Sequence, residues 1–457
     1  MNQPVRTLDV QQFIDAERFS PCQWLILILC FLVVAADGYD TAVIGFIAPS
    51  LVKDWGVDRS ALGPVMSAAL VGLGVGALIA GPVADRLGRK AMLVLSVVCF
   101  GAWSLVAAHA QTIGELTALR FLTGLGLGAA MPNAVTLMSE YAPARLRGVA
   151  VNAMFCGFSC GVVAGGVASA WLIPHAGWQS VLTVGGIAPI VLAVPLALLL
   201  PESVQFLAVR PGKQAQIARI LKRIAPQAQL NDLRFVGAQT QESTQGQYAL
   251  AIILSGHYLR RTLMLWIAYF MGLLIYYLLA SWMPMLFKDA GFSDKFAALM
   301  TSLFPLGGVL GNLCAGWLMD RFNANRTIVG TYLLAGVLVL IVGRFVGSPM
   351  LLGALIFVSG MAITAAVVSM SAYAASLYPT EGRATGVAWM LGVGRVGGVA
   401  SAFVGAALVG LGWSFGEVFG LLAVPAVAAA FALYTIGNCR SEYTDAERAA
   451  GATAQSH

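Results

Sequence analysis

Twelve apolar runs, each long enough to cross a membrane as a helix, dominate this 457-residue sequence. A helix needs about 20 apolar residues to span the hydrocarbon core of a bilayer. Hydrophobic residues make up 59% of the chain and charged residues only 11%, whereas soluble domains carry about 25% charged residues. Because backbone polar groups must be bonded internally in lipid, these runs predict an all-α membrane protein. The predicted spans are 22–48, 60–84, 90–110, 113–139, 148–173, 178–200, 260–286, 292–319, 327–346, 350–378, 384–411 and 416–437.

The positive charges are distributed unevenly between the two sides of these spans. With the N-terminus placed in the cytoplasm, the inner segments hold 20 of the 27 Lys and Arg residues and the outer loops hold five. Cytoplasmic loops carry such an excess in membrane proteins, so both termini are expected in the cytoplasm. The net charge of +6 therefore needs no nucleic-acid partner.

One long polar segment divides the spans into six and six. The predicted organisation is an N-terminal six-helix bundle at 1–200, a cytoplasmic central loop at 201–259, a C-terminal six-helix bundle at 260–437 and a cytoplasmic tail at 438–457. The basic stretch at 219–223 favours either short amphipathic helices on the membrane surface or a solvated linker.

Two motifs of the first half return in the second at nearly the same offset. Gly81–Arg86 corresponds to Gly316–Arg321, 235 positions later, and Pro143–Arg147 corresponds to Pro379–Arg383, 236 positions later. This pattern predicts duplication of a six-helix unit in one orientation. Parallel repeats of this kind are typical of transporters whose substrate site lies between the halves.

Two acids, Asp37 and Asp40, interrupt the first apolar run. A carboxylate in mid-membrane costs about 2.5–3.5 kcal/mol on insertion scales and usually has a functional reason. Their spacing puts both on one helix face, where two close carboxylates do not both stay ionised easily. The pair indicates a proton-coupled transporter. The alternative is that both acids line a wet cavity or pair with nearby Arg residues.

Two Arg residues, Arg120 and Arg395, fall inside predicted spans. Arg120 is a candidate to bind an anionic substrate or to influence the proton site, or else to pair structurally with Glu140 or an Asp of the first span. Arg395 lies 12 residues beyond Arg383, roughly 18 Å along a helix, which is too deep for its side chain to reach the interface easily. Its planar guanidinium can bind both oxygens of a carboxylate.

The segment 81–90 reads GPVADRLGRK. Its glycines are expected to allow a tight turn, and Asp85 to accept a charge-assisted hydrogen bond from an Arg or a helix N-terminus. Here the sequence resembles the major facilitator superfamily, which implies twelve transmembrane helices in two six-helix parallel repeats. The resemblance implies that this loop controls conformational switching through Gly81, Asp85, Arg86, Gly88 and Arg89, with Asp320 and Arg321 as its second copy.

Within that superfamily the chain is similar to the bacterial aromatic acid:proton symporters, especially those that carry 4-hydroxybenzoate and protocatechuate. The segments that carry this likeness are 37–41, 45–49, 62–69, 120–133, 154–158 and 378–394. The resemblance implies that Asp37 and Asp40 serve coupling. It also implies functional sensitivity at Arg120, Glu140, Arg383 and Arg395, and Arg147 is grouped with the switching residues.

The expected function is import of a small aromatic carboxylate with protons across the bacterial inner membrane. The proton is the coupling ion, no other cofactor or metal is expected, and the protein is expected to be a monomer in the lipid bilayer. The alternatives are a related acid (benzoate, gentisate, vanillate, 3-hydroxybenzoate or muconate), efflux of aromatic compounds, or a transporter-like chemoreceptor. An enzyme is not expected, because the G-x-S-x-G match at Gly157–Gly161 lies in an apolar helix and not in a strand–turn–helix.

Overall fold

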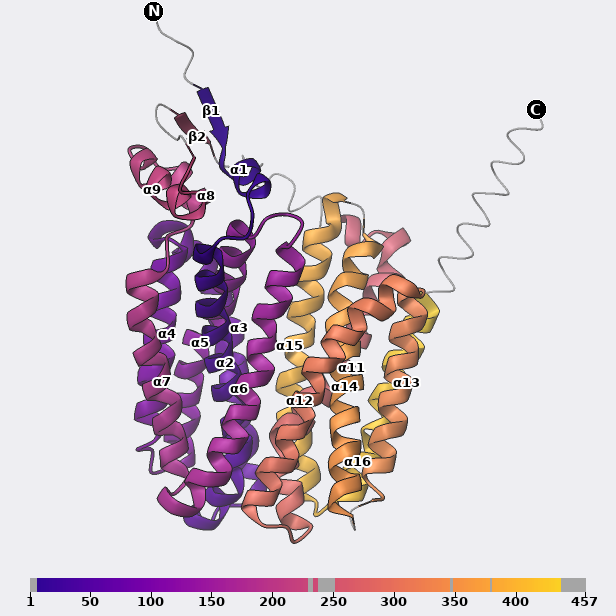
Figure 1. The fold of residues 1–457 in the computed structure, drawn as a ribbon. Coiled ribbons are helices and arrows are strands. Elements are labelled where there is room, and N and C mark those ends of the chain that lie inside the picture. Colours follow the sequence, from indigo (N-terminus) through magenta and orange to yellow (C-terminus); the bar gives the residue numbers. More distant parts are fainter. Residues whose placement is uncertain (1–5, 229–232, 237–250, 346–347, 379, 437–457) are drawn as a thin grey trace, which may run out of the picture. The chain divides into compact units, whose positions relative to one another are not determined.

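The computed structural model describes residues 6–228, 233–236, 251–345, 348–378 and 380–436. These residues include twelve helices that are long and apolar enough to cross a membrane, which confirms the predicted all-α architecture (Figure 1). The first six spans lie in α2 (Pro21–Trp55), α3 (Leu62–Leu87), α4 (Arg89–Ala107), α5 (Ile113–Tyr141), α6 (Arg147–Ala176) and α7 (Trp178–Leu199). The other six lie in α11 (Gly256–Asp289), α12 (Asp294–Arg321), α13 (Ala324–Val342), α14 (Pro349–Leu377), α15 (Thr380–Gly410) and the span Phe415–Ile436, which begins with α16 (Phe415–Leu421).

The contacts within the chain group it into two compact units. Of the described residues, unit 1 takes those within Met1–Leu51 and Ala68–Gln241, and unit 2 takes those within Val52–Ser67 and Glu242–His457. The end of α2, the short 3-10 helix η1 (Arg59–Ala61) and the start of α3 therefore pack with unit 2. There Arg59 Nη2 lies 2.7 Å from Asp289 Oδ1 of α11. The predicted boundaries at 200 and 259 stay predictions.

Glycines let the helices of unit 1 approach each other backbone to backbone. A Cβ added at Gly161 of α6 would overlap the carbonyl oxygen of Ala35 in α2, and one at Gly38 of α2 would overlap the carbonyl oxygen of Phe158 in α6. The segment Gly157–Gly161 is thus a small-xxx-small contact within a membrane helix. The segment is helical and is not the strand–turn–helix that the hydrolase motif requires.

Short elements gather at one end of unit 1 (Figure 1). Strand β1 (Arg6–Asp9) pairs in parallel with β2 (Leu233–Val236), with Arg6 opposite Leu233, and α1 (Val10–Ala16) follows β1 directly. From the polar segment come α8 (Val204–Ala208) and α9 (Gln214–Ile224). Helix α9 buries four apolar side chains in the core of unit 1, those of Ile217, Ile220, Leu221 and Ile224. This confirms an amphipathic helix and excludes a merely solvated linker at 214–224.

Replacing Gly161 with Ala should loosen the contact between α2 and α6, because the added methyl meets backbone and not a movable side chain. Overpacking of this kind costs about 1–3 kcal/mol, so the apparent melting temperature of detergent-purified protein should fall. Gly148→Ala is the matched control on the same helix, since nothing lies within 4 Å of a Cβ there and Ala favours helix over Gly. Equal melting temperatures for the two variants would contradict the proposed packing.

Candidate substrate and proton site

Helix α2 carries both predicted acids in the interior of unit 1. The exposed fraction is 1% for Asp37 and 0% for Asp40. Neither side chain therefore lines a wide solvated opening within unit 1, and each carboxylate must be stabilised by groups of the protein.

Asp40 is held by two other helices of unit 1. The Arg120 guanidinium of α5 donates from Nη1 to Oδ1 at 3.0 Å and lies with Nη2 2.9 Å from Oδ2, which makes a two-point ion pair. Arg120 Nη2 also donates to the backbone carbonyl of Asp40 at 3.0 Å, and Ser104 Oγ of α4 donates to Oδ1 at 2.8 Å. The side chain of Arg120 is only 1% exposed. The opposite charges and the planar fork fit a buried ion pair, although Asp40 Oδ2 and Arg120 Nε make no hydrogen bond with any residue that the structure describes.

The partner of Arg120 is therefore the Asp of the first span and not Glu140. The structure thus shows one of the roles expected for Arg120, a structural ion pair with Asp40. The pairing also puts Arg120 next to the proposed proton site, because Asp37 is one turn away on the same helix. Ser104 was not expected from the sequence, where a lone Ser in an apolar run gives no signal.

The neighbours of the two acids are also fixed. Thr41 Oγ1 donates to Asp37 Oδ1 at 3.3 Å. Tyr39, which lies between the acids, donates from its hydroxyl to the Val181 carbonyl of α7 at 3.0 Å. The segment 37–41 is consequently anchored to α4, α5 and α7 at once.

Arg395 belongs to unit 2, where it lies half-buried on α15. Its charge acts electrostatically on the phenol of Tyr269 in α11. Helices α11 and α15 pack closely here, since a Cβ on Gly394 would overlap the Tyr269 ring. Tyr269 and Tyr276 are buried, and the Tyr276 ring lies 5.6 Å from that of Phe304 in α12. A half-buried cation thus lies beside an aromatic cluster.

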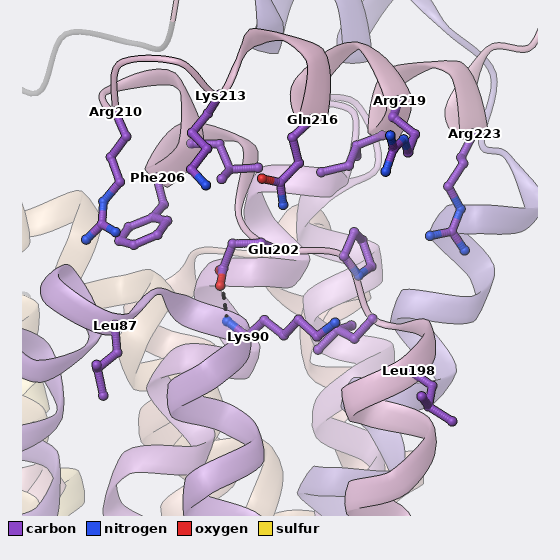
Figure 2. A pocket seen from close by; sticks show the side chains of 14 residues that line it. Leu87, Lys90, Leu198, Glu202, Phe206, Arg210, Lys213, Gln216, Arg219 and Arg223 are labelled. Carbon is purple, nitrogen blue, oxygen red and sulfur yellow. Dashed lines mark hydrogen bonds between the residues drawn. The ribbon is translucent and has the colours of Figure 1, made fainter.

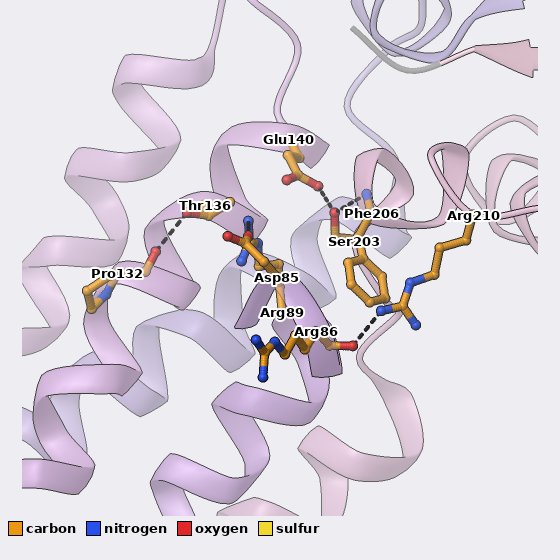
Figure 3. Close-up of polar contacts among 9 residues, drawn as sticks. All are labelled: Asp85, Arg86, Arg89, Pro132, Thr136, Glu140, Ser203, Phe206 and Arg210. Atoms are coloured by element: carbon orange, nitrogen blue, oxygen red, sulfur yellow. Dashed lines mark hydrogen bonds and ion pairs between the residues drawn. The ribbon is translucent and has the colours of Figure 1, made fainter. Parts of the chain in front are cut away.

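The switching motif forms a sharp junction between α3 and α4. Of the two glycines in this segment, Gly81 lies inside α3, and the expected turn occurs at Gly88, whose φ of +100° favours glycine. Asp85 accepts from Arg89 with 2.6 Å between Oδ1 and Nη2, which confirms the expected bond from an Arg (Figure 3). The side chain of Asp85 is 66% exposed.

Residues after α7 complete this junction. Glu202 Oε1 accepts from the backbone N–H of Lys90 at 3.0 Å and of Ser203 at 2.8 Å, which places a carboxylate at the N-terminus of α4. Ser203 Oγ donates to Glu140 Oε2, and the charge of Arg89 also acts on Glu140 (Figure 3). Glu202 and Ser203 were not selected from the sequence, because a Pro-Glu-Ser turn after a span is not specific.

The remaining motif residues are spread over both units. The backbone carbonyl of Arg86 accepts from Arg210, and Arg147 begins α6 half-buried. In unit 2, the guanidinium of Arg321 lies 5.6 Å from the Trp317 ring centroid, and Arg383 is exposed on α15. Asp320 lies in α12, but its side chain falls outside the description.

Removing either member of the Asp40–Arg120 pair should destabilise the protein strongly, because the other charge is left buried. The expected loss is about 3–5 kcal/mol for Asp40→Asn or Arg120→Gln alone, measured as thermal stability in detergent. The double variant should lose clearly less than the sum of the two single losses. Ser104→Ala, which removes one neutral donor, should cost only about 1 kcal/mol. Strictly additive losses would show that the pair is not coupled.

Comparisons with known proteins agree with this architecture. The family model of the Major Facilitator Superfamily matches residues 30–299 and 265–454. The 4-hydroxybenzoate transporter of Pseudomonas aeruginosa is 51% identical over 96% of this chain and 98% of its own length, and the gallate transporter of Pseudomonas putida is 46% identical over 96% and 97%. A partially occluded inward-open structure of the Escherichia coli xylose transporter has a TM-score of 0.69 at 20% identity, covering 91% of this chain and 98% of that one, and so shares the fold. The chain is a multi-pass membrane transporter that belongs to the Major Facilitator Superfamily.

Proposed function

We propose that this transporter imports an aromatic carboxylate into the cell together with protons, and that 4-hydroxybenzoate is the first substrate to test. Relatives named as 4-hydroxybenzoate transporters are 51%, 49% and 48% identical over at least 94% of this chain. Relatives named for gallate and benzoate are 46% and 32% identical. All three compounds are benzene rings with one carboxylate, which supports this substrate class.

The observation that carries the coupling proposal is the two-point ion pair between Asp40 and Arg120 beside a second buried acid. Protonating Asp40 would leave the buried charge of Arg120 uncompensated, at a cost of several kcal/mol. Asp40 is therefore assigned as the anchor of Arg120, and Asp37 as the carrier of the coupling proton. A protonated Asp37 and an ionised Asp40 in one helix also avoid two close negative charges.

The proposed partner of the substrate carboxylate is Arg395. Its guanidinium can bind both carboxylate oxygens, and the aromatic side chains of α11 offer ring surfaces to a benzene ring. Two Asp and two Arg residues in the spans sum to zero charge when all are ionised. A substrate anion and a proton that enter together preserve this neutrality, which avoids an uncompensated charge in a dry site.

The orientation follows from the distribution of Lys and Arg. The excess of positive charge in the segments on one side supports cytoplasmic termini in the inner membrane. Transport would proceed by alternating access, with the junction around Gly88 and the Asp85–Arg89 pair acting in conformational switching and not in substrate binding.

The test is uptake of labelled 4-hydroxybenzoate by proteoliposomes, with and without an inward proton gradient. We expect accumulation above equilibrium only with the gradient. Asp37→Asn should abolish this gradient-driven accumulation, because an amide cannot release a proton. Asp58→Asn, at an exposed position, is the matched control and should transport as the wild type does.

Concentrative uptake by Asp37→Asn would reject the assignment of the coupling proton. Absence of uptake by folded wild-type protein under both conditions would reject 4-hydroxybenzoate as the substrate. Gallate and benzoate would then be measured in the same liposomes, because relatives named for them are 46% and 32% identical to this chain.

Arg395→Gln should weaken binding of 4-hydroxybenzoate far more than binding of its uncharged amide. Loss of a charge-assisted hydrogen bond of about 1.5–3 kcal/mol corresponds to roughly a 10- to 100-fold rise in Kd for the acid. Calorimetric titration of both ligands checks the difference, with the exposed Arg344→Gln as the control in the same unit. Equal losses for acid and amide would make Arg395 a structural residue.

A further inference from the structure

A cavity of about 440 Å³ lies at the end of unit 1 where α8 and α9 cover the ends of α4 and α7 (Figure 2). One wall of the cavity comes from the membrane helices and includes Lys90 and Leu198. The other wall comes from the segment after α7, between Leu200 and Arg223. Leu87, Lys90 and Glu202 belong to the switching junction, but no lining residue belongs to the proposed substrate or proton site, so the cavity itself needs its own explanation.

Positive charge dominates this cavity. Five cationic side chains line it against one carboxylate, that of Glu202; the cations are Lys90, Arg210, Lys213, Arg219 and Arg223. Figure 2 shows Lys213 and Arg223 extending from the α9 side toward the side that carries Glu202 and Lys90. The cations come from α4, from the turn before α9 and from α9 itself, so the fold and not one basic run assembles them.

The five cations of this cluster form no ion pair with a carboxylate in the described part of the chain. The four ion pairs found among those residues involve none of the five cations. Glu202 already accepts two backbone hydrogen bonds. Arg210 is oriented in advance, since its guanidinium lies 4.1 Å from the Phe206 ring centroid and donates to the Arg86 carbonyl. An anion of matching size would therefore find several donors pointing into one hollow.

The other edge of the cavity is apolar and exposed. Leu198 is 74% exposed and Leu87 is 52% exposed, although both line the cavity. Exposed Val191 and Val194 continue this apolar surface along α7. Because these side chains are exposed on helices long enough to cross a membrane, we expect them to face lipid chains. The cavity thus opens where the lipid-facing surface of unit 1 meets its basic end.

We infer that this cavity binds the phosphate headgroup of an anionic phospholipid, with the acyl chains lying along Leu198 and the outer face of α7. A phosphate diester supplies the negative charge and the acceptor oxygens with which the five cations can pair. The acyl chains of the lipid would cover the exposed leucines, which a soluble anion would leave exposed. Basic pockets beside membrane helices bind such headgroups in other membrane proteins. A lipid in this position would contact both α9 and the first turn of α4, and so would link the segment after α7 to the switching junction.

The test is lipid binding to the purified full-length transporter, measured by native mass spectrometry during titration with phosphatidylglycerol or phosphatidylcholine. We expect a saturable phosphatidylglycerol site that phosphatidylcholine fills at least tenfold more weakly. Arg219→Gln and Arg223→Gln should each weaken that site about fivefold, which corresponds to about one charge near a membrane surface. Lys222→Gln is the matched control, because Lys222 is exposed on the same helix but does not line the cavity.

Two results would overturn the inference. If Lys222→Gln weakens phosphatidylglycerol binding as much as Arg219→Gln does, the lipid is attracted by the overall positive charge of α9, and the cavity is not a binding site. If glycerol 3-phosphate or inorganic phosphate displaces phosphatidylglycerol at equal phosphate concentration, the ligand is a soluble phosphate and not a lipid. Substituting Leu198 with Gln separates these cases further, since it should weaken phosphatidylglycerol binding and leave binding of a soluble phosphate unchanged.

Discussion

The buried ion pair between Asp40 and Arg120 is the interaction on which the rest of unit 1 depends. Two charges that are at most 1% exposed cannot rely on water, so each needs the other in a fixed geometry. The Asp40 carboxylate is contacted at both oxygens by Arg120 of α5 and accepts a hydrogen bond from the Ser104 hydroxyl of α4. The Arg120 guanidinium also donates to the α2 backbone. Three helices are therefore held at one depth and one rotation about their axes. A shift of any one of them would expose an unpaired charge to lipid or to the protein interior.

Such a geometry is possible only because the helices are close. Arg and Asp side chains are only just long enough to meet across a helix interface, so the helix backbones must be close. In unit 1 glycines allow this close approach. Added Cβ atoms at Gly124 and Gly128 of α5 would overlap carbonyl oxygens of Ala69 and Leu73 in α3, and one at Gly161 would overlap that of Ala35 in α2. In membranes, where the hydrophobic effect does not drive helices together, close backbone contact supplies the packing energy. The glycines near Arg120 in the sequence thus position the helix that carries it.

Much of this could be predicted from the sequence, and the physical reason is the bilayer. A membrane permits few backbone structures, so the twelve spans and the helical context of Gly157–Gly161 follow from apolar length. Charges in such spans are conspicuous, which is why Asp37, Asp40, Arg120 and Arg395 could be selected from the residues. Ser104 could not, since a serine in an apolar run can bond its own helix backbone and costs little. Which of the two glycines makes the turn could not be predicted either, because both fit a turn and only the position of the α4 N-terminus decides between them.

The two units share a duplicated plan, but their charges differ. The motif around Asp85 returns around Asp320, and the segment at the start of α6 returns at the start of α15. Arg395 instead falls opposite Ser159 of α6 in the repeat, a buried small residue in the helix that packs on α2. An Arg at Ser159 would add a fourth ionisable group to Asp37, Asp40 and Arg120 in the membrane helices of unit 1. In the proposed function, unit 1 would carry the acid that exchanges a proton, and Arg395 of unit 2 would bind the substrate carboxylate. Such a division would let one fold, used twice, hold a proton site in one copy and an anion site in the other.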